Sequence, residues 1–162
     1  MLAPPLLAAV ALAVGSGAET PAASYLVSVD GRVRWARQER ASRVRVNPTG
    51  LDATGQSSCA ADLLVLTQAA LARPEFVARV GLARASVATV AGRRFELTSS
   101  NALLGKVRGA AGVKTGSTAR AGECLVALAE REGHRVIVIP LGAEDRWGAA
   151  AALIEAGFDA TP

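Results

Sequence analysis

Three times along the chain, a short segment of β-forming residues is followed by a turn and a second such segment. The first pair, Ser24–Val29 and Arg32–Arg37, flanks the dipeptide Asp30-Gly31. Asp-Gly between alternating segments is a strong hairpin signal, because both residues tolerate the positive φ of tight turns. The other two pairs are Ser86–Val90 with Arg93–Leu97, joined by Ala91-Gly92, and Glu123–Ala129 with Arg135–Leu141, joined by residues 130–134. These hairpins predict a mostly antiparallel sheet.

Apolar residues at helical spacing predict a helix between the first two hairpins. Its stripe consists of Leu63, Leu64, Leu66, Ala70 and Leu71. Ser57 or Ser58 is expected to cap the first turn, where the charge of Asp62 favours the helix dipole. The helix should end before Pro74, and this proline can open a short second helix through Val80.

A further helix is predicted over the alanine-rich segment Asp145–Ala156, with Gly157 just beyond its C-terminus. Asn101–Leu104 is expected to form a turn or a short helix. Helices that flank antiparallel hairpins indicate a sheet with helices packed on it. The predicted fold class is therefore α+β, an α/β sandwich.

The first 23 residues predict a secretory signal peptide. Leu6–Val14 has the length of its apolar core and is too short to span a bilayer. Ser16-Gly17-Ala18 fits a cleavage site, although no lysine or arginine precedes the apolar run. We therefore expect an exported protein, periplasmic or otherwise extracytoplasmic, with one domain over residues 24–162.

The basic charge of the chain does not indicate a nucleic-acid partner. The net charge is +4, but the densest basic stretch, Arg32–Arg45, contains no aromatic residue except Trp35 and no nucleic-acid-binding motif. The two cysteines, Cys59 and Cys124, lack the spacing of a metal site, and we expect neither metal nor cofactor. Buried free thiols are favoured over a disulfide, but spacing alone leaves their pairing open.

The segment around Lys114-Thr115-Gly116 carries the most chemical information. A lysine ammonium makes a charge-assisted contact with a substrate carboxylate, and a threonine hydroxyl can bond the same group. A glycine lets a substrate backbone lie against the strand edge. The backbone N–H of Ser117 can then donate to a developing oxyanion. The triplet occurs in penicillin-binding proteins and β-lactamases, and we expect it at the end of a strand.

Further segments, in the same order and at similar spacing, strengthen this likeness. They are Ser24–Arg37, Asn47-Pro48-Thr49-Gly50-Leu51, Ser99–Leu104, Val113–Thr118 with Ala121–Val126, and Leu141-Gly142-Ala143 with the last helix. In these segments the chain resembles the serine-type D-alanyl-D-alanine carboxypeptidases, members of the penicillin-binding and β-lactamase-like transpeptidase family. The resemblance implies a peptidoglycan stem peptide ending in D-Ala-D-Ala as the partner. It also implies that Lys114, Thr115 and Gly116 bind that substrate.

One departure from the family pattern concerns the nucleophile. In that family a Ser-x-x-Lys follows the first hairpin, and a Ser-x-Asn lies on a helical subdomain. Here Ala41–Val46 continues directly into Asn47-Pro48. The only lysines are Lys106 and Lys114, and no serine stands three residues before either. Both the nucleophile segment and the helical subdomain are therefore expected to be missing.

No other residue replaces this nucleophile and base convincingly. Ser42 is followed three residues later by Arg45, and a guanidinium stays protonated. The Ser99-Ser100-Asn101 triplet matches Ser-x-Asn, but its place just upstream of Lys114 suits a different segment of the family. The single histidine, His134, falls in a predicted turn, where we expect it to be solvated. Two carboxylates, Asp52 and Glu123, have no evident partner in the sequence.

Two hypotheses remain open from the sequence. In the first, the chain is a shortened family member without activity, either a gene remnant or a module that binds wall peptides; β-lactams could bind it but would not acylate it. In the second, it is a working carboxypeptidase whose nucleophile comes from an unexpected residue or a partner chain. The missing helices should expose apolar surface, so we also expect self-association or poor solubility.

Overall fold

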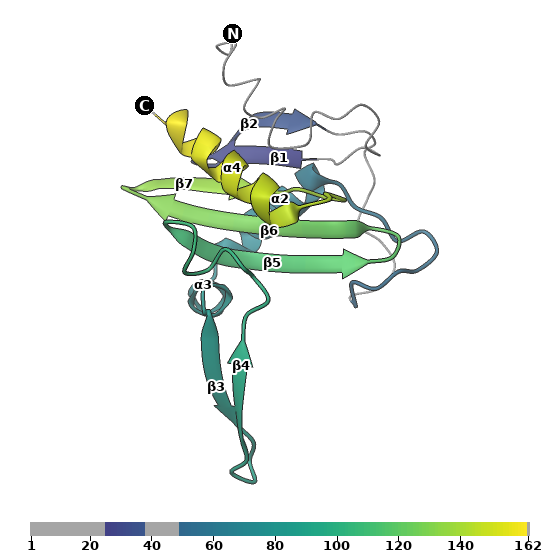
Figure 1. The fold of residues 1–162 in the computed structure, drawn as a ribbon, viewed down its shortest axis with the longest axis vertical. Helices are drawn as coiled ribbons and strands as arrows, with labels where there is room; N and C mark the ends of the chain where they lie inside the picture. Colours follow the sequence, from purple (N-terminus) through teal and green to yellow (C-terminus); the bar gives the residue numbers. More distant parts are fainter. Residues whose placement is uncertain (1–24, 38–48, 162) are drawn as a thin grey trace.

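A computed structural model of the chain describes residues 25–37 and 49–161 (Figure 1). Its main sheet has five antiparallel strands in the order β2-β1-β7-β6-β5. These strands are β1 (Tyr25–Val29), β2 (Arg32–Arg37), β5 (Ala110–Thr118), β6 (Gly122–Arg131) and β7 (His134–Val138). A separate ribbon consists of β3 (Arg84–Ala88) and β4 (Arg94–Thr98), and the helices are α2 (Ala60–Leu71), α3 (Pro74–Val80) and α4 (Arg146–Asp159). The predicted α+β class is confirmed.

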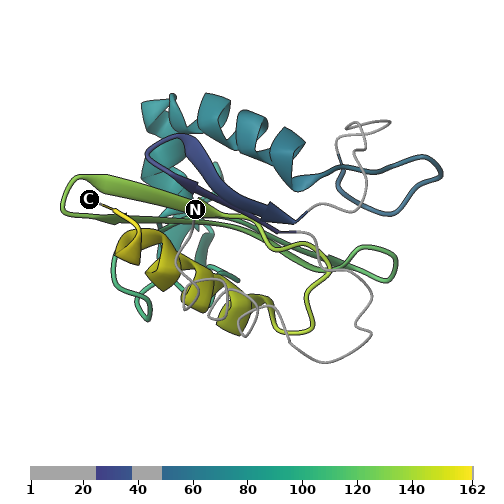
Figure 2. The ribbon, with the colours of Figure 1, turned by 90° about the horizontal axis from the view of Figure 1, so that it is seen from above.

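Two helices cover the two faces of the main sheet, as Figure 2 shows. Side chains of successive strand residues point to opposite faces. Val27 and Val29 therefore pack toward Leu153 of α4, whereas Leu26 belongs to the cluster that contains Leu64 of α2. This three-layer arrangement is the predicted α/β sandwich. The predicted signal peptide, Ser42 and the junction before Pro48 lie outside the described residues.

All three predicted hairpins are confirmed by antiparallel pairing. In the first, Asp30 and Gly31 both have positive φ, at 48° and 80°, as the turn requires. The second and third hairpins differ from their predicted bounds by a few residues at the strand ends. Residues 102–106 form a turn rather than a helix, one of the two forms expected for this segment.

The start and the buried face of α2 differ from the prediction. Cys59 occupies the N-cap position without a side-chain cap bond, so neither Ser57 nor Ser58 caps the helix. The helix buries Ala60, Leu64, Thr67 and Leu71, while Leu66 is 53% exposed. The apolar stripe predicted from the leucines is therefore rotated about the helix axis relative to the face that is buried. The predicted ending and the short helix from Pro74 to Val80 are confirmed.

The last helix continues beyond its predicted end. Asp145 caps α4 by accepting hydrogen bonds from the N–H groups of Trp147 and Gly148, both at 3.0 Å. Gly157 lies inside the helix, not beyond it. A Cβ at this position would stand 2.6 Å from a methyl group of Val136 on β7. Glycine is therefore used here for close packing of the helix on the sheet, which the sequence pattern cannot distinguish from a helix end.

Both cysteines are free thiols, which answers the pairing left open by the sequence. Cys59 is buried as expected, but Cys124 is only partly so. Burial raises the pKa of the Cys124 thiol.

Among the described residues, no helix has the length and apolar character needed to cross a bilayer.

Candidate functional site

The Lys114-Thr115-Gly116 triplet lies on β5, the outermost strand of the main sheet (Figure 1). Lys114 is paired with Val126 of β6, Thr115 with Leu125 and Gly116 with Cys124. The strand continues to Thr118, so the triplet is inside β5 rather than at its end as predicted. The other edge of β5 has no partner strand among the described residues. An unpaired strand edge is one of the surfaces that can pair with an extended segment of another chain.

A groove runs along this part of β5. It encloses about 620 Å³ over the face that β5 shares with β6, between residues 114–118, residues 124–126 and the loop from Gly50 to Ser58, with Leu63 of α2 and Leu141 also on its wall. The three residues predicted to bind substrate, Lys114, Thr115 and Gly116, line it, as does Ser117, whose N–H is the predicted oxyanion donor. The structure thus brings the predicted set together in one cavity. On the opposite wall, Gly50 comes from the Asn47–Leu51 segment that resembles the family, and the other lining residues of this loop lie between Asp52 and Ser58.

The side chains of the triplet are accessible to a ligand. Lys114 is exposed, and its ammonium donates a hydrogen bond to the Thr115 carbonyl. Gly116 is exposed, and a Cβ built there would meet no atom within 4 Å. Neither packing nor a positive φ therefore requires glycine at this position. A strand edge without a side chain is what the close approach of another backbone needs.

The Ser99–Asn101 segment packs against the same strand. The Ser100 hydroxyl lies 2.8 Å from the Thr115 hydroxyl. Asn101 is buried, where its amide donates to the Gly112 carbonyl and its side-chain oxygen accepts from the N–H of Leu103, both at 3.1 Å. Asn101 thus has a structural role, and it fixes the position from which Ser100 reaches the triplet.

Asp52 belongs to the site, although its sequence context shows no partner for it. One of its carboxylate oxygens accepts a hydrogen bond from the Thr118 hydroxyl at 2.7 Å, and the other accepts from the Arg120 N–H at 3.2 Å. These bonds join the 50–58 loop to the end of β5. The partners are more than 60 residues away along the chain, so no local pattern predicts the contact.

Arg146 is a second residue of the site that no sequence motif indicates. From the first turn of α4, its guanidinium donates to the Gly116 carbonyl at 2.8 Å. The same group stacks over the Trp147 ring, 4.6 Å from its centroid, and lies 3.7 Å from the carboxylate of Glu123. The expectation that Glu123 lacks a partner is therefore wrong. Arg146 fastens the glycine of the triplet to the helix layer behind the sheet.

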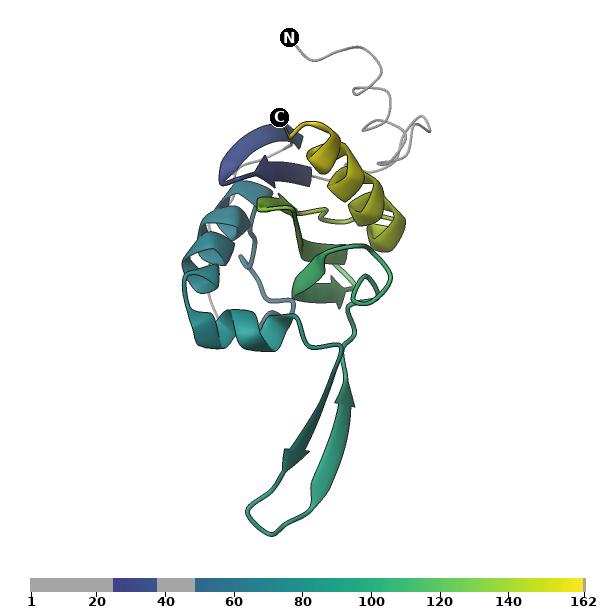
Figure 3. The same ribbon diagram turned by 90° about the vertical axis from the view of Figure 1, so that its left-hand side faces the viewer.

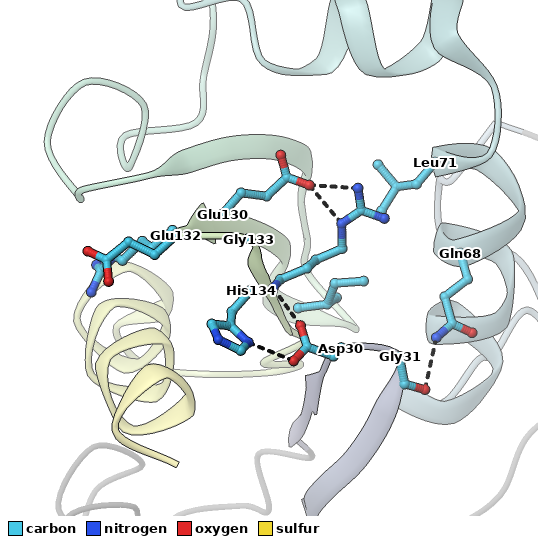
Figure 4. Close-up of a pocket in the computed structure, with 11 residues that line it drawn as sticks. Asp30, Gly31, Gln68, Leu71, Glu130, Glu132, Gly133 and His134 are labelled. Atoms are coloured by element: carbon cyan, nitrogen blue, oxygen red, sulfur yellow. Dashed lines mark hydrogen bonds and ion pairs between the residues drawn. The ribbon is translucent and has the colours of Figure 1, made fainter. Parts of the chain in front are cut away.

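His134 lies away from this groove, at the β6–β7 turn. It is the first residue of β7, and its Nδ1 is 2.9 Å from the Asp30 carboxylate in a separate pocket of about 590 Å³ (Figure 4). The hydrogen bond from His134, reinforced by the N–H of Arg135, lowers the pKa of Asp30. His134 is thus paired rather than simply solvated, and it does not line the groove beside Lys114.

The described residues contain no cluster of three or more His, Cys, Asp or Glu suited to a metal ion.

Residues 42–145 match the sequence model of the family described as D-alanyl-D-alanine carboxypeptidase. D-alanyl-D-alanine carboxypeptidase DacB2 of Mycobacterium tuberculosis is 33% identical over 123 residues, which cover 71% of this chain and 42% of the relative. D-alanyl-D-alanine carboxypeptidase DacF of Bacillus subtilis is 26% identical and is matched over 37% of its length, with 85% of this chain covered.

Solved structures give the same likeness. Penicillin-binding protein D2 of Listeria monocytogenes, in its cefotaxime-bound form, superposes with a TM-score of 0.59 at 37% identity, over 70% of this chain and 47% of its own. A D-alanyl-D-alanine carboxypeptidase of M. tuberculosis H37Rv gives a TM-score of 0.63 at 33% identity, over 71% and 46%. The chain spans less than half the length of each of these relatives. With its family match over residues 42–145 and the Lys-Thr-Gly groove on its edge strand, this chain belongs to the D-alanyl-D-alanine carboxypeptidase family.

Proposed function

We propose that this protein binds peptidoglycan stem peptides ending in D-Ala-D-Ala along β5, without forming an acyl-enzyme. The observation that carries the proposal is the groove in which Lys114, Thr115 and Gly116 lie together, in a chain with no serine three residues before a lysine. The relatives named D-alanyl-D-alanine carboxypeptidases and the solved penicillin-binding protein with bound ampicillin support the ligand class.

The binding mode follows from the chemistry of the strand edge. An extended peptide adds beside β5, using main-chain hydrogen bonds for affinity. Its terminal carboxylate attracts the Lys114 ammonium away from the Thr115 carbonyl and accepts a hydrogen bond from the Thr115 hydroxyl. Gly116 leaves room for the peptide backbone, and the Ser117 N–H is the donor for the carbonyl of the last peptide bond. Arg146 keeps the Gly116 carbonyl in place during this contact.

Acyl transfer needs a nucleophile activated by a nearby base. Beside the triplet, the hydroxyl of Ser100 contacts Thr115, another hydroxyl, and neither group is a base at neutral pH. The geometry therefore supports binding without turnover: a pseudoenzyme derived from a hydrolase family. β-Lactams are expected to enter the groove and to leave it unchanged.

The remaining parts of the proposal concern location and assembly. We propose that residues 1–23 direct export and that the domain acts outside the cytoplasm, where wall peptides are found. We also propose that the protein self-associates through α2, because Val65 and Leu66 on this helix are 65% and 53% exposed.

A peptide titration tests the binding proposal. Addition of a stem peptide ending in D-Ala-D-Ala to the ¹⁵N-labelled protein should shift the amide resonances of residues 114–118 saturably. Lys114→Ala should weaken binding at least tenfold, since it removes a charge-assisted contact. Lys106 is the other lysine of the chain, and it does not line the groove. Lys106→Ala is therefore the matched control and should bind like the wild type. Equal binding by the Lys114→Ala variant would show that Lys114 does not hold the peptide carboxylate, and no binding by the wild type would favour the gene-remnant alternative.

A further inference from the structure

The β3–β4 ribbon extends away from the five-stranded sheet (Figures 1 and 3). Its tip is a short loop, Val90-Ala91-Gly92, closed by hydrogen bonds between Thr89 and both Gly92 and Arg93. Gly92 has a φ of 81°, as such a hairpin loop requires. Strands of five residues span about 17 Å at roughly 3.3 Å per residue. The ribbon is therefore long enough to contact a partner that the main sheet does not touch.

One face of the ribbon is apolar. The cross-strand register pairs Val87 with Phe95 and Ala85 with Leu97, which places these four side chains on one side. Val87 is 46% exposed, Phe95 39% and Leu97 50%, and Val90 at the tip is fully exposed. A two-stranded ribbon is only marginally stable alone in water. A continuous apolar face of this kind indicates an interaction surface.

Positive charge lies next to the apolar side chains at the tip, from Arg93, and on the opposite face of the ribbon, from Arg84 and Arg94. The ribbon carries Arg84, Arg93 and Arg94 but only one acidic residue, Glu96. The Arg93 guanidinium lies over the Phe95 ring, 4.8 Å from its centroid, so the charge is next to the apolar side chains near the tip. An apolar tip bordered by arginines matches the interface of an anionic bilayer, where acyl chains lie beneath negative headgroups.

We propose that the β3–β4 ribbon docks on an anionic lipid surface. Val90 and Phe95 enter the headgroup region, and Arg93 and Arg94 contact the lipid phosphates. A second copy of the chain is a poorer occupant, because its ribbon carries the same excess of positive charge. The proposal does not depend on peptide binding in the β5 groove.

Vesicle co-sedimentation tests this docking. The full chain should bind phosphatidylglycerol-containing vesicles at least tenfold more tightly than pure phosphatidylcholine vesicles, and added salt should weaken the binding. Val90→Ser with Phe95→Ser should reduce binding at least tenfold, as should Arg93→Ser with Arg94→Ser. The matched controls are in β2, an edge strand of the main sheet that is not part of the ribbon. They are Val33→Ser, and Arg32→Ser with Arg34→Ser. These controls should bind like the wild type.

Thermal unfolding of every variant establishes that it is folded before its binding is compared. Equal affinity for both kinds of vesicle would overturn the proposal, as would ribbon variants that bind no worse than the β2 controls. So would concentration-dependent self-association without lipid that the same ribbon substitutions abolish, since the ribbon would then be an interface between copies.

Discussion

The Thr118 hydroxyl donates a hydrogen bond to the Asp52 carboxylate at 2.7 Å, which fastens the 50–58 loop to the end of β5. The Arg120 N–H bonds the second oxygen of the same carboxylate. Asp52 thereby holds together the two walls of the groove that contains Lys114. Asp52→Ala should increase hydrogen exchange of residues 50–58 and lower the free energy of unfolding by about 1 kcal/mol.

Asp52→Asn is the control for this loop prediction. Its amide keeps one acceptor oxygen but loses the charge, so its effect should be intermediate. Unchanged exchange in the loop of the Asp52→Ala variant would show that other contacts position this wall.

Substitution of Asn101 tests whether its buried hydrogen bonds hold the Ser99–Asn101 segment against β5. Asn101→Ala would leave the Gly112 carbonyl and the Leu103 N–H without their side-chain partners in a buried place. We expect a loss of about 1–3 kcal/mol in the free energy of unfolding, measured by urea denaturation. Asn101→Asp retains the acceptor for Leu103 and loses the donor to Gly112. A loss below that of Ser100→Ala, which alters an exposed hydroxyl, would contradict the structural role.

Gly157 should be intolerant of a side chain. Gly157→Ala would place a methyl group 2.6 Å from Val136 in the core, and we expect it to cost about 1–3 kcal/mol. Val136→Ala in the same chain should recover part of that loss by making room. If the alanine instead stabilises the helix, as propensity alone predicts, then α4 is not packed this closely on β7.

The Arg131–Glu155 ion pair should make stability depend on acid pH. Two hydrogen bonds of 2.6 Å from the Arg131 guanidinium lower the pKa of the Glu155 carboxyl. The stabilisation by this ion pair is therefore complete above the ordinary glutamate pKa of about 4.5. It is lost as the pH falls through the lowered pKa of Glu155.

The matching experiment compares wild type and Glu155→Gln by denaturation from neutral to acid pH. Because Glu155 is largely exposed, the two free energies of unfolding should differ by at most about 1 kcal/mol at neutral pH. This difference should shrink on acidification. A difference that is the same at every pH would mean that the carboxylate charge contributes nothing.

Self-association through α2 is tested by sedimentation velocity over a range of protein concentrations. The wild type should associate as the concentration rises, and Val65→Ser with Leu66→Ser should shift the protein toward monomer, because both side chains are exposed on this helix. Val33→Ser, on β2, removes a similarly exposed side chain and serves as the control. A wild type that remains monomeric throughout would refute the proposed contact.

Local patterns were sufficient to predict most of the fold. Asp30-Gly31 and the alternation around it specify the first hairpin, and Pro74 specifies the start of α3, because each acts on neighbouring backbone angles. The cap of α2 and the end of α4 were predicted wrongly for a common reason. Ser58 and Gly157 have residue types that suit helix ends, but Cys59 occupies the N-cap of α2, and Gly157 lies where α4 packs closely on β7.

The candidate site was only partly predictable from sequence. Lys114, Thr115, Gly116 and Ser117 form a contiguous motif, and one strand necessarily holds them together. Asp52 and Arg146 reach this strand from loops and helices distant in sequence, so their contacts depend on the order of strands in the sheet. A single sequence contains no local signal for such contacts.

Intact-mass spectrometry after incubation with a penicillin tests the central claim most directly. The mass of the full chain should not change, because no serine here has a lysine three residues later to act as its base. A covalent adduct equal to the mass of the penicillin, on Ser100 or any other residue of this chain, would contradict it.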